Sequence, residues 1–77
     1  MPIIPRYLDS VRNRVRELRS EAGMTQSDLG DALGVSRQTI NSIEGGRYLP
    51  SLPLAFRIAR LFDTDLEQIF EVEEADR

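Results

Sequence analysis

Three neighbouring side chains, those of Arg37, Gln38 and Asn41, are of types that can each form paired hydrogen bonds with the edge of a nucleic-acid base. The guanidinium of arginine fits guanine in this way, and the amides of glutamine and asparagine fit adenine. Ile40 and Ile43 are spaced so that both fall on one side of a helix. If these isoleucines point inward, the three polar side chains point outward, where they can meet a ligand.

Most other chemistry is excluded by composition. The 77 residues include no cysteine and no histidine, which removes disulfides, thiolate or imidazole metal sites and nucleophilic pairs with histidine. A chain of this length forms one domain at most and has no room for an enzyme cleft. We therefore expect no catalytic activity, no metal and no cofactor.

The charge is distributed unevenly along the chain. A net charge of −3 argues against a polyanionic partner. However, residues 1–47 carry seven arginines and six acidic residues, whereas residues 48–77 carry three arginines and seven acidic residues. The more basic half contains the three polar side chains that could recognise bases.

The elements that must position these side chains follow from apolar spacing. Val11, Val15, Leu18 and Ala22 recur at helical intervals and predict a first helix from residue 11 that ends at Gly23. The arginines between them, Arg12, Arg14 and Arg16, are interpreted as a solvated face in preference to a phosphate clamp.

Capping residues mark the next two helices. Thr25 with Asp28 resembles a capping box and begins a helix that runs to Leu33. Gly34 ends that helix, and Ser36 caps another that runs to about Glu44.

Two further helices are expected after a loop in which Tyr48 and Leu49 pack between the loop and the core or, as the alternative, contact a second copy of the chain. Ser51 caps the fourth helix, with Pro53 tolerated in its first turn, and Thr64 caps the fifth. The side chains expected to face inward from these helices are Leu54, Ile58, Leu61, Phe62, Leu66, Ile69 and Phe70.

The pattern predicts an all-α fold of five helices with short connections. We divide the chain into an N-terminal extension (1–10), a helical domain (11–70) and an acidic tail (71–77), and we expect the tail to be loosely held. Ile3 and Ile4 of the extension either add to a dimer interface or are disordered. The first ten residues lack the basic region and long apolar stretch of a signal peptide, and no stretch of consecutive apolar residues is long enough to span a membrane. A cytoplasmic protein without membrane contact is expected.

Residues 26–45 hold two short helices that must pack closely. Gly30 lets the helices approach and Gly34 supplies the turn between them. The order and spacing of LRSEAGMTQSDLGDALGVSRQTINSIEGGRYLPSL (18–52) and LAFRIARLFDTDLEQIF (54–70) resemble the phage repressor and Cro-like helix-turn-helix regulators, also called the xenobiotic-response-element type. Gly30 departs from this family, which commonly has alanine there.

The resemblance implies a lambda-repressor-like DNA-binding domain whose recognition helix, residues 37–44, lies in the major groove. The implied base contacts are Arg37, Gln38, Asn41 and, more weakly, Ser42. The implied phosphate contacts are Gln26, Ser36, Thr39 and Arg47. In the family an arginine of the first helix pairs with a glutamate that ends the recognition helix, which implies a structural ion pair of Arg19 and Glu44.

The function expected on these grounds is a transcriptional regulator, acting as a repressor, that binds double-stranded operator DNA as a homodimer. Two alternatives stay open. One is an antitoxin, which uses the same fold to bind its operator and a toxin. The other is a protein-interaction module without DNA binding, which the acidic balance favours. A protein partner, either a toxin or the polymerase, is compatible with the expected function.

Overall fold

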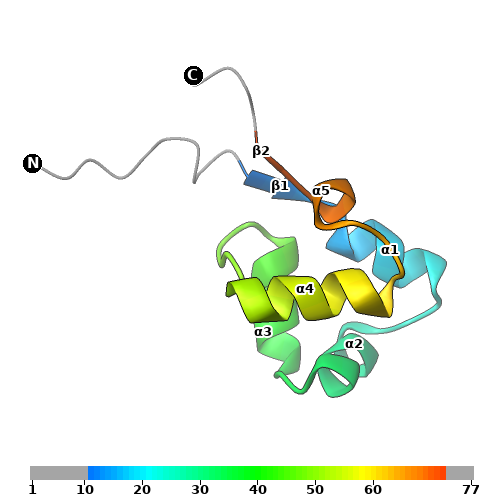
Figure 1. Ribbon diagram of the computed structural model, residues 1–77. Coiled ribbons are helices and arrows are strands. Elements are labelled where there is room, and N and C mark those ends of the chain that lie inside the picture. Colours follow the sequence, from blue (N-terminus) through cyan, green and yellow to red (C-terminus); the bar gives the residue numbers. More distant parts are fainter. Residues whose placement is uncertain (1–10, 73–77) are drawn as a thin grey trace, which may run out of the picture.

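The structure, a computed structural model, describes residues 11–72 as a small helical domain with a short two-stranded ribbon (Figure 1). The predictions for residues 1–10, including Ile3 and Ile4, and for residues 73–77 lie outside the described part. In chain order the elements are β1 (Val11–Asn13), α1 (Val15–Glu21), α2 (Gln26–Leu33), α3 (Arg37–Glu44), α4 (Leu52–Leu61), α5 (Leu66–Ile69) and β2 (Phe70–Val72).

The five predicted helices are all present among the described residues, and most of the predicted caps are confirmed. The Thr25 hydroxyl accepts from the Asp28 backbone N–H while the Asp28 carboxylate accepts from the Thr25 N–H, both at 2.9 Å. Ser51 accepts from the backbone N–H of Leu54 at 3.3 Å. The cap predicted at Thr64 is wrong: α5 begins one residue later, after Asp65, and has no side-chain cap.

The first helix begins later than predicted. Val11–Asn13 is a strand, and it pairs antiparallel with β2 so that Val11 is opposite Val72. The Asn13 side chain ends the strand, because its Oδ1 accepts from the Val15 N–H at 3.1 Å and its Nδ2 donates to the Ile43 carbonyl at 2.9 Å. The four-residue spacing from Val11 to Val15 fits a helix equally well, and the strand partner lies at the other end of the chain.

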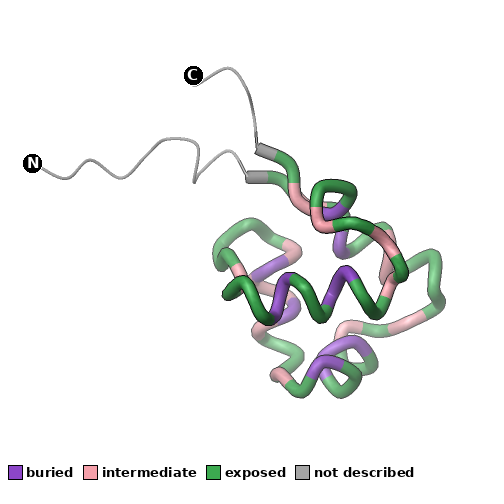
Figure 2. The backbone as a smooth tube through the Cα atoms, viewed as in Figure 1, coloured by how far each residue is buried: buried purple, intermediate pink, exposed green. Residues whose placement is uncertain are grey.

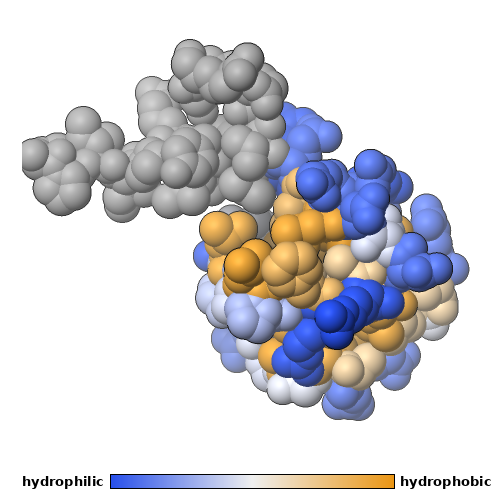
Figure 3. Space-filling model, in the orientation of Figure 1, coloured by the Kyte–Doolittle hydropathy of each residue, from blue (hydrophilic) through white to orange (hydrophobic). Residues whose placement is uncertain are grey.

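The core lies where the helices meet (Figure 2). The predicted inward residues Leu54, Ile58 and Ile69 are buried, but Leu61 is 42% exposed. Tyr48 and Leu49, which were expected to pack on the core, are 46% and 53% exposed, so that prediction is also wrong. Apolar surface shows on the face of the domain that carries α4 (Figure 3). The buried cluster consists of Val15, Leu29, Leu33, Ile40, Ile43, Leu54, Ile58, Ala59 and Ile69.

The corner between α2 and α3 is as tight as the two glycines suggested. A Cβ built on Gly30 would lie 2.7 Å from the backbone oxygen of Val35, a separation that requires something to shift. Gly34 has a φ of +75°, the left-handed conformation that ends many helices. The Arg57 guanidinium donates to the carbonyl oxygen of Leu33 and ties α4 to this corner. The corner therefore fixes how α3 is presented.

Substitution of Gly34 tests this account of the corner. We expect Gly34→Ala to lower the free energy of unfolding by about 1 kcal/mol, because alanine is strained at positive φ. Gly45→Ala is the matched control, since Gly45 has a φ of −82° and an added Cβ would come within 3.0 Å only of the flexible end of Arg47. Urea denaturation measures both, and an equal loss in the two variants would contradict the conformational explanation.

None of the helices in residues 11–72 has the length and apolar character needed to cross a bilayer.

Candidate nucleic-acid interface

Helix α3 buries its apolar side and presents its polar side. Ile40 and Ile43 are completely buried. Arg37 and Gln38 are exposed, and Asn41 is partly buried. The outward orientation expected from the spacing is present, so the helix offers polar side chains to a ligand.

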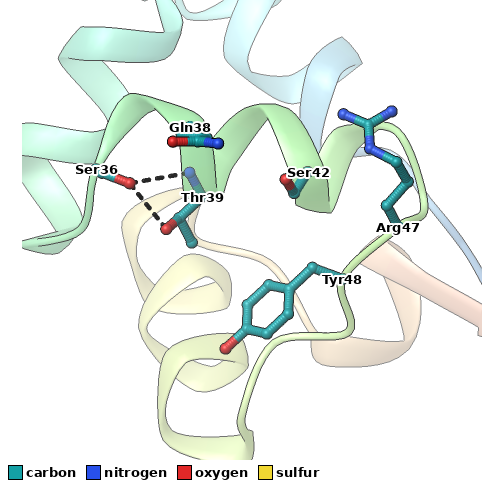
Figure 4. A pocket seen from close by; sticks show the side chains of 6 residues that line it. All are labelled: Ser36, Gln38, Thr39, Ser42, Arg47 and Tyr48. Carbon is teal, nitrogen blue, oxygen red and sulfur yellow. Dashed lines mark hydrogen bonds between the residues drawn. The ribbon is translucent and has the colours of Figure 1, made fainter.

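The beginning of α3 is held by two hydroxyls. Ser36 Oγ accepts from the Thr39 backbone N–H at 3.0 Å, and the two hydroxyl oxygens lie 2.9 Å apart (Figure 4). Ser36 thus satisfies one of the N–H groups that a helix start leaves free. Both hydroxyls remain at the surface beside the start of the helix.

One side of α3 borders a shallow hollow of about 280 Å³. Arg47 and Tyr48 lie at the end of the hollow that follows the helix (Figure 4). The backbone N–H groups of these two residues donate to the Ser42 carbonyl at 2.9 and 3.2 Å, which holds the loop against the helix. The hollow is lined by Ser36, Gln38, Thr39, Ser42, Arg47 and Tyr48.

Five of these six lining residues are among those predicted to contact a base or a phosphate. Tyr48 was not among the predicted site residues. The sequence nevertheless places a tyrosine directly after Arg47, at the end of the helix expected to contact DNA. Because a tyrosine hydroxyl can donate a hydrogen bond to a phosphate, this position could have suggested Tyr48 as a site residue.

The side of α3 that faces α2 carries the other two base-contact candidates. Gln26, the first residue of α2, donates through Nε2 to the Asn41 Oδ1 at 3.2 Å and to the Glu44 Oε1 at 3.1 Å. Its Oε1 accepts from the Arg37 Nη1 at 3.5 Å. The Gln26 side chain, expected to contact a phosphate, therefore connects three residues of α3. Sequence reasoning missed this connection.

Glu44 is the most enclosed charged side chain of the interface. Its carboxylate is fully shielded from solvent and accepts from Arg19 Nε at 2.6 Å and from Arg19 Nη2 at 3.1 Å. Arg16 Nε adds a third contact at 3.4 Å. The sequence interpretation placed Arg16 on a solvated face; its side chain is 65% exposed, and the sequence did not predict that it also reaches Glu44. Arg14 of the same run lies 3.2 Å from the exposed carboxylate of Glu17.

These contacts shift the titration of the pair. Burial is the largest single influence on the pKa of Glu44 and raises it, but hydrogen bonds from Arg19, Gln26 and Arg16 outweigh burial and leave the pKa below its ordinary value. The hydrogen bond with Glu44 likewise raises the pKa of Arg19. Both groups are therefore charged at neutral pH.

The lowered pKa of Glu44 predicts a pH dependence of stability. A carboxyl whose pKa is lowered by folding stabilises the protein above its unfolded pKa, about 4.3, and loses this contribution as the pH falls through the folded value. We expect the difference in Tm between the native chain and Glu44→Gln to be constant from pH 8 to pH 5 and to shrink below pH 4. Thermal unfolding followed by circular dichroism measures it, and an undiminished difference at pH 3 would contradict the assignment.

A helix-turn-helix family and several known proteins are similar to this chain in sequence. The HTH_3 family model, described as helix-turn-helix, matches residues 15–69. The chain is 45% identical to the uncharacterized HTH-type transcriptional regulator YgzD of Bacillus subtilis, over 83% of this chain and 97% of that protein. It is 48% identical to the uncharacterized HTH-type transcriptional regulator MJ0272 of Methanocaldococcus jannaschii, with the same coverage of 83% and 97%.

Solved structures resemble the fold as well. The restriction-modification controller protein C.AhdI from Aeromonas hydrophila superposes with a TM-score of 0.65 at 29% identity, over 71% of this chain and 83% of that one. The helix pair, the sequence similarity and the fold all indicate the same family, and the chain belongs to the HTH_3 family of helix-turn-helix proteins.

Proposed function

We propose that this protein is a sequence-specific regulator of transcription that binds double-stranded DNA with α3 in the major groove. The observation that carries the proposal is the presentation of α3, which is fixed by a tight corner with α2 while Arg37 and Gln38 stand exposed. The major groove is wide enough to admit one helix. Membership of the family and the similarity to HTH-type transcriptional regulators support this function.

Four side chains of α3 contact bases in this proposal. Arg37 pairs with guanine, and Gln38 and Asn41 pair with adenine. Asn41 Oδ1 keeps a second lone pair beside its bond to Gln26, so the amide can still form a paired contact. Ser42 is shorter and contributes a single hydrogen bond.

The phosphate contacts flank α3 on both sides. Ser36, Thr39 and Arg47 border the hollow and contact phosphates beside it. Gln26 contacts a phosphate through its backbone N–H, because both hydrogens of its side-chain amide are already donated within the protein. The start of α2 adds partial positive charge there. Arg19 and Glu44 are structural and contact no DNA.

A homodimer is the functional unit of this proposal. One domain of this size makes few base contacts, and two copies on half-sites about 34 Å apart multiply specificity. Occupation of an operator near a promoter excludes the polymerase, so the regulator acts as a repressor in the cytoplasm. None of these steps needs a catalytic group or a cofactor.

Selection of duplexes from a random pool at moderate salt tests the proposal. We expect an enriched inverted repeat whose half-sites are one helical turn apart. We also expect the affinity to fall steeply with salt, because bound phosphates release counterions. A pool without enrichment, together with no salt-dependent affinity, would reject the proposal and favour a protein-interaction module.

A further inference from the structure

Two successive hydrogen bonds lead from the buried carboxylate of Glu44 to a base-contact candidate on α3. The Glu44 side chain has no exposed surface. Its Oε1 accepts from Gln26 Nε2 at 3.1 Å, and the same amide nitrogen donates to Asn41 Oδ1 at 3.2 Å. We refer to Glu44, Gln26 and Asn41 as the hydrogen-bond path. The path joins a charge inside the domain to a side chain that is proposed to contact a base.

The direction of the Gln26 amide is determined by the groups on either side of it. The Glu44 carboxylate can only accept, so Gln26 must turn its amide nitrogen toward it. The Arg37 guanidinium can only donate, so the amide oxygen of Gln26 must face Arg37 Nη1, which lies 3.5 Å away. The Gln26 side chain therefore has one allowed orientation, whereas the amide of a free glutamine side chain can turn over.

Gln26 in turn determines the direction of the Asn41 amide. Because Gln26 presents a donor, Asn41 must present Oδ1 to it, and Asn41 Nδ2 lies on the opposite side of the amide. Within the described residues, Asn41 Nδ2 donates no hydrogen bond, so its hydrogens are available to a ligand. An amide held in one direction matches only one order of donor and acceptor on the edge of a base.

We infer that Glu44, acting through Gln26, sets the direction in which the Asn41 amide reads its base pair. This inference rests on the proposed function, to which it adds two determinants of base specificity. Glu44 and Gln26 are positioning residues, because neither side chain touches a base. Adenine presents the acceptor N7 beside the N6 amino donor. A fixed amide matches this edge in one orientation of the base pair and not in the reverse one.

The hydrogen-bond path also prepares Asn41 before DNA arrives. Ordering one flexible side chain at an interface weakens binding by about two- to tenfold. Gln26 orders the Asn41 amide during folding, so this loss is avoided when DNA binds. Without Gln26 the loss should fall on the base pair that Asn41 reads. A phosphate contact made by the Gln26 side chain would instead strengthen binding to every duplex, so the two explanations can be separated.

The test uses the full chain and Gln26→Met, which replaces the amide by an uncharged side chain of similar length. Gln68→Met is the matched control, because Gln68 is an exposed glutamine that lines a different hollow. Glu44→Gln and Asn41→Ala change the two ends of the hydrogen-bond path. Circular dichroism checks that each variant is folded. Fluorescence anisotropy measures affinity for the selected duplex, for a duplex with the base pair of Asn41 reversed, and for an unrelated duplex.

We expect Gln26→Met to lower the preference for the selected over the reversed base pair about fivefold for each half-site. Its affinity for the unrelated duplex should stay within twofold. In the Asn41→Ala background, Gln26→Met should cause no further loss of preference, and Gln68→Met should behave like the native chain. A loss of equal size on all three duplexes would overturn the inference.

The Glu44 end of the path is tested in the same way. Glu44→Gln should lose the same preference as Gln26→Met, because an amide at this position can present either its oxygen or its nitrogen to Gln26. A folded Glu44→Gln protein with the native preference would contradict the role of Glu44. If Glu44→Gln does not fold, Gln26→Met alone decides the inference.

A measurement without DNA separates this inference from the proposed function. NMR of the side-chain amides should show the Asn41 signal displaced in Gln26→Met and in Glu44→Gln, and unchanged in Gln68→Met. An Asn41 signal that stays in place in the first two variants would overturn the inference. If the native chain binds no DNA, the proposed function fails, and the amide signals still decide whether Glu44 and Gln26 direct Asn41.

Discussion

Replacement of Glu44 by alanine is expected to lower the free energy of unfolding by about 3 kcal/mol, because it breaks a buried ion pair. The Glu44 carboxylate is fully shielded, and the Arg19 side chain that it binds is only 15% exposed. Without Glu44 the guanidinium keeps its charge but loses two hydrogen bonds. Gln26 also loses an acceptor. Urea denaturation at pH 7 measures the loss.

Two comparisons make this result interpretable. Glu17→Ala removes the carboxylate of an exposed pair with Arg14, so it should cost about 0.5 kcal/mol or less. Arg37→Ala alters an exposed side chain and should leave the unfolding midpoint nearly unchanged. Equal midpoints for Glu44→Ala and Arg37→Ala would refute the structural role of Glu44. If Glu44→Ala does not fold, Glu44→Gln still reports the loss of the charge.

Arg37→Ala is expected to have the largest effect on DNA recognition. A paired contact between arginine and guanine contributes about 2 kcal/mol of discrimination, which corresponds to a loss near thirtyfold for each half-site. Arg37 is exposed, and within the described residues its side chain hydrogen bonds only with Gln26, at the long distance of 3.5 Å. Its substitution should therefore remove the proposed contact to DNA without disturbing the fold. Anisotropy titrations with the selected duplex and with an unrelated duplex measure the change.

Arg60→Ala is the matched control for this measurement. It removes the same charge from an exposed position of α4, away from the hollow beside α3. We expect both variants to lose the same small amount of affinity for unrelated DNA, and only Arg37→Ala to lose affinity for the selected duplex. A loss of equal size in Arg60→Ala would mean that general charge, not base contact, explains the effect.

Local chemistry made much of the fold predictable. Thr25, Ser36 and Ser51 each accept from a backbone N–H three residues later, so the start of a helix can be read from the chain itself. The turn at Gly34 needs only a residue that tolerates positive φ. Both features depend on neighbours in sequence, and both were predicted.

Contacts between distant residues were not predictable in the same way. The pairing of Val11 with Val72 joins the two ends of the domain. The spacing of apolar residues within either short strand does not predict this pairing. The position of Gln26 between α2 and α3 depends on how closely the helices pack. Arg16 looked like one arginine of a solvated run, because its partner Glu44 is 28 residues away. The exposure of Leu49 likewise depends on how its loop packs against the rest of the domain.

The acidic balance of the chain is compatible with DNA binding because charge is separated in space. Glu44 is the acidic residue at the end of α3, and it is neutralised by Arg19 and Arg16. The acids near α5 belong to a different hollow. The surface beside α3 retains the exposed guanidinium groups of Arg37 and Arg47. Net charge alone would therefore be a poor guide to what this protein binds.

The most direct test of base recognition by α3 is a parallel selection of random duplexes with the native chain, Arg37→Ala and Asn41→Ala. The account predicts the same inverted repeat for all three proteins. It also predicts that each variant loses preference at its own base pair in each half-site, a guanine for Arg37 and an adenine for Asn41. Unchanged preferences in both variants would contradict the central claim that these side chains of α3 read the operator.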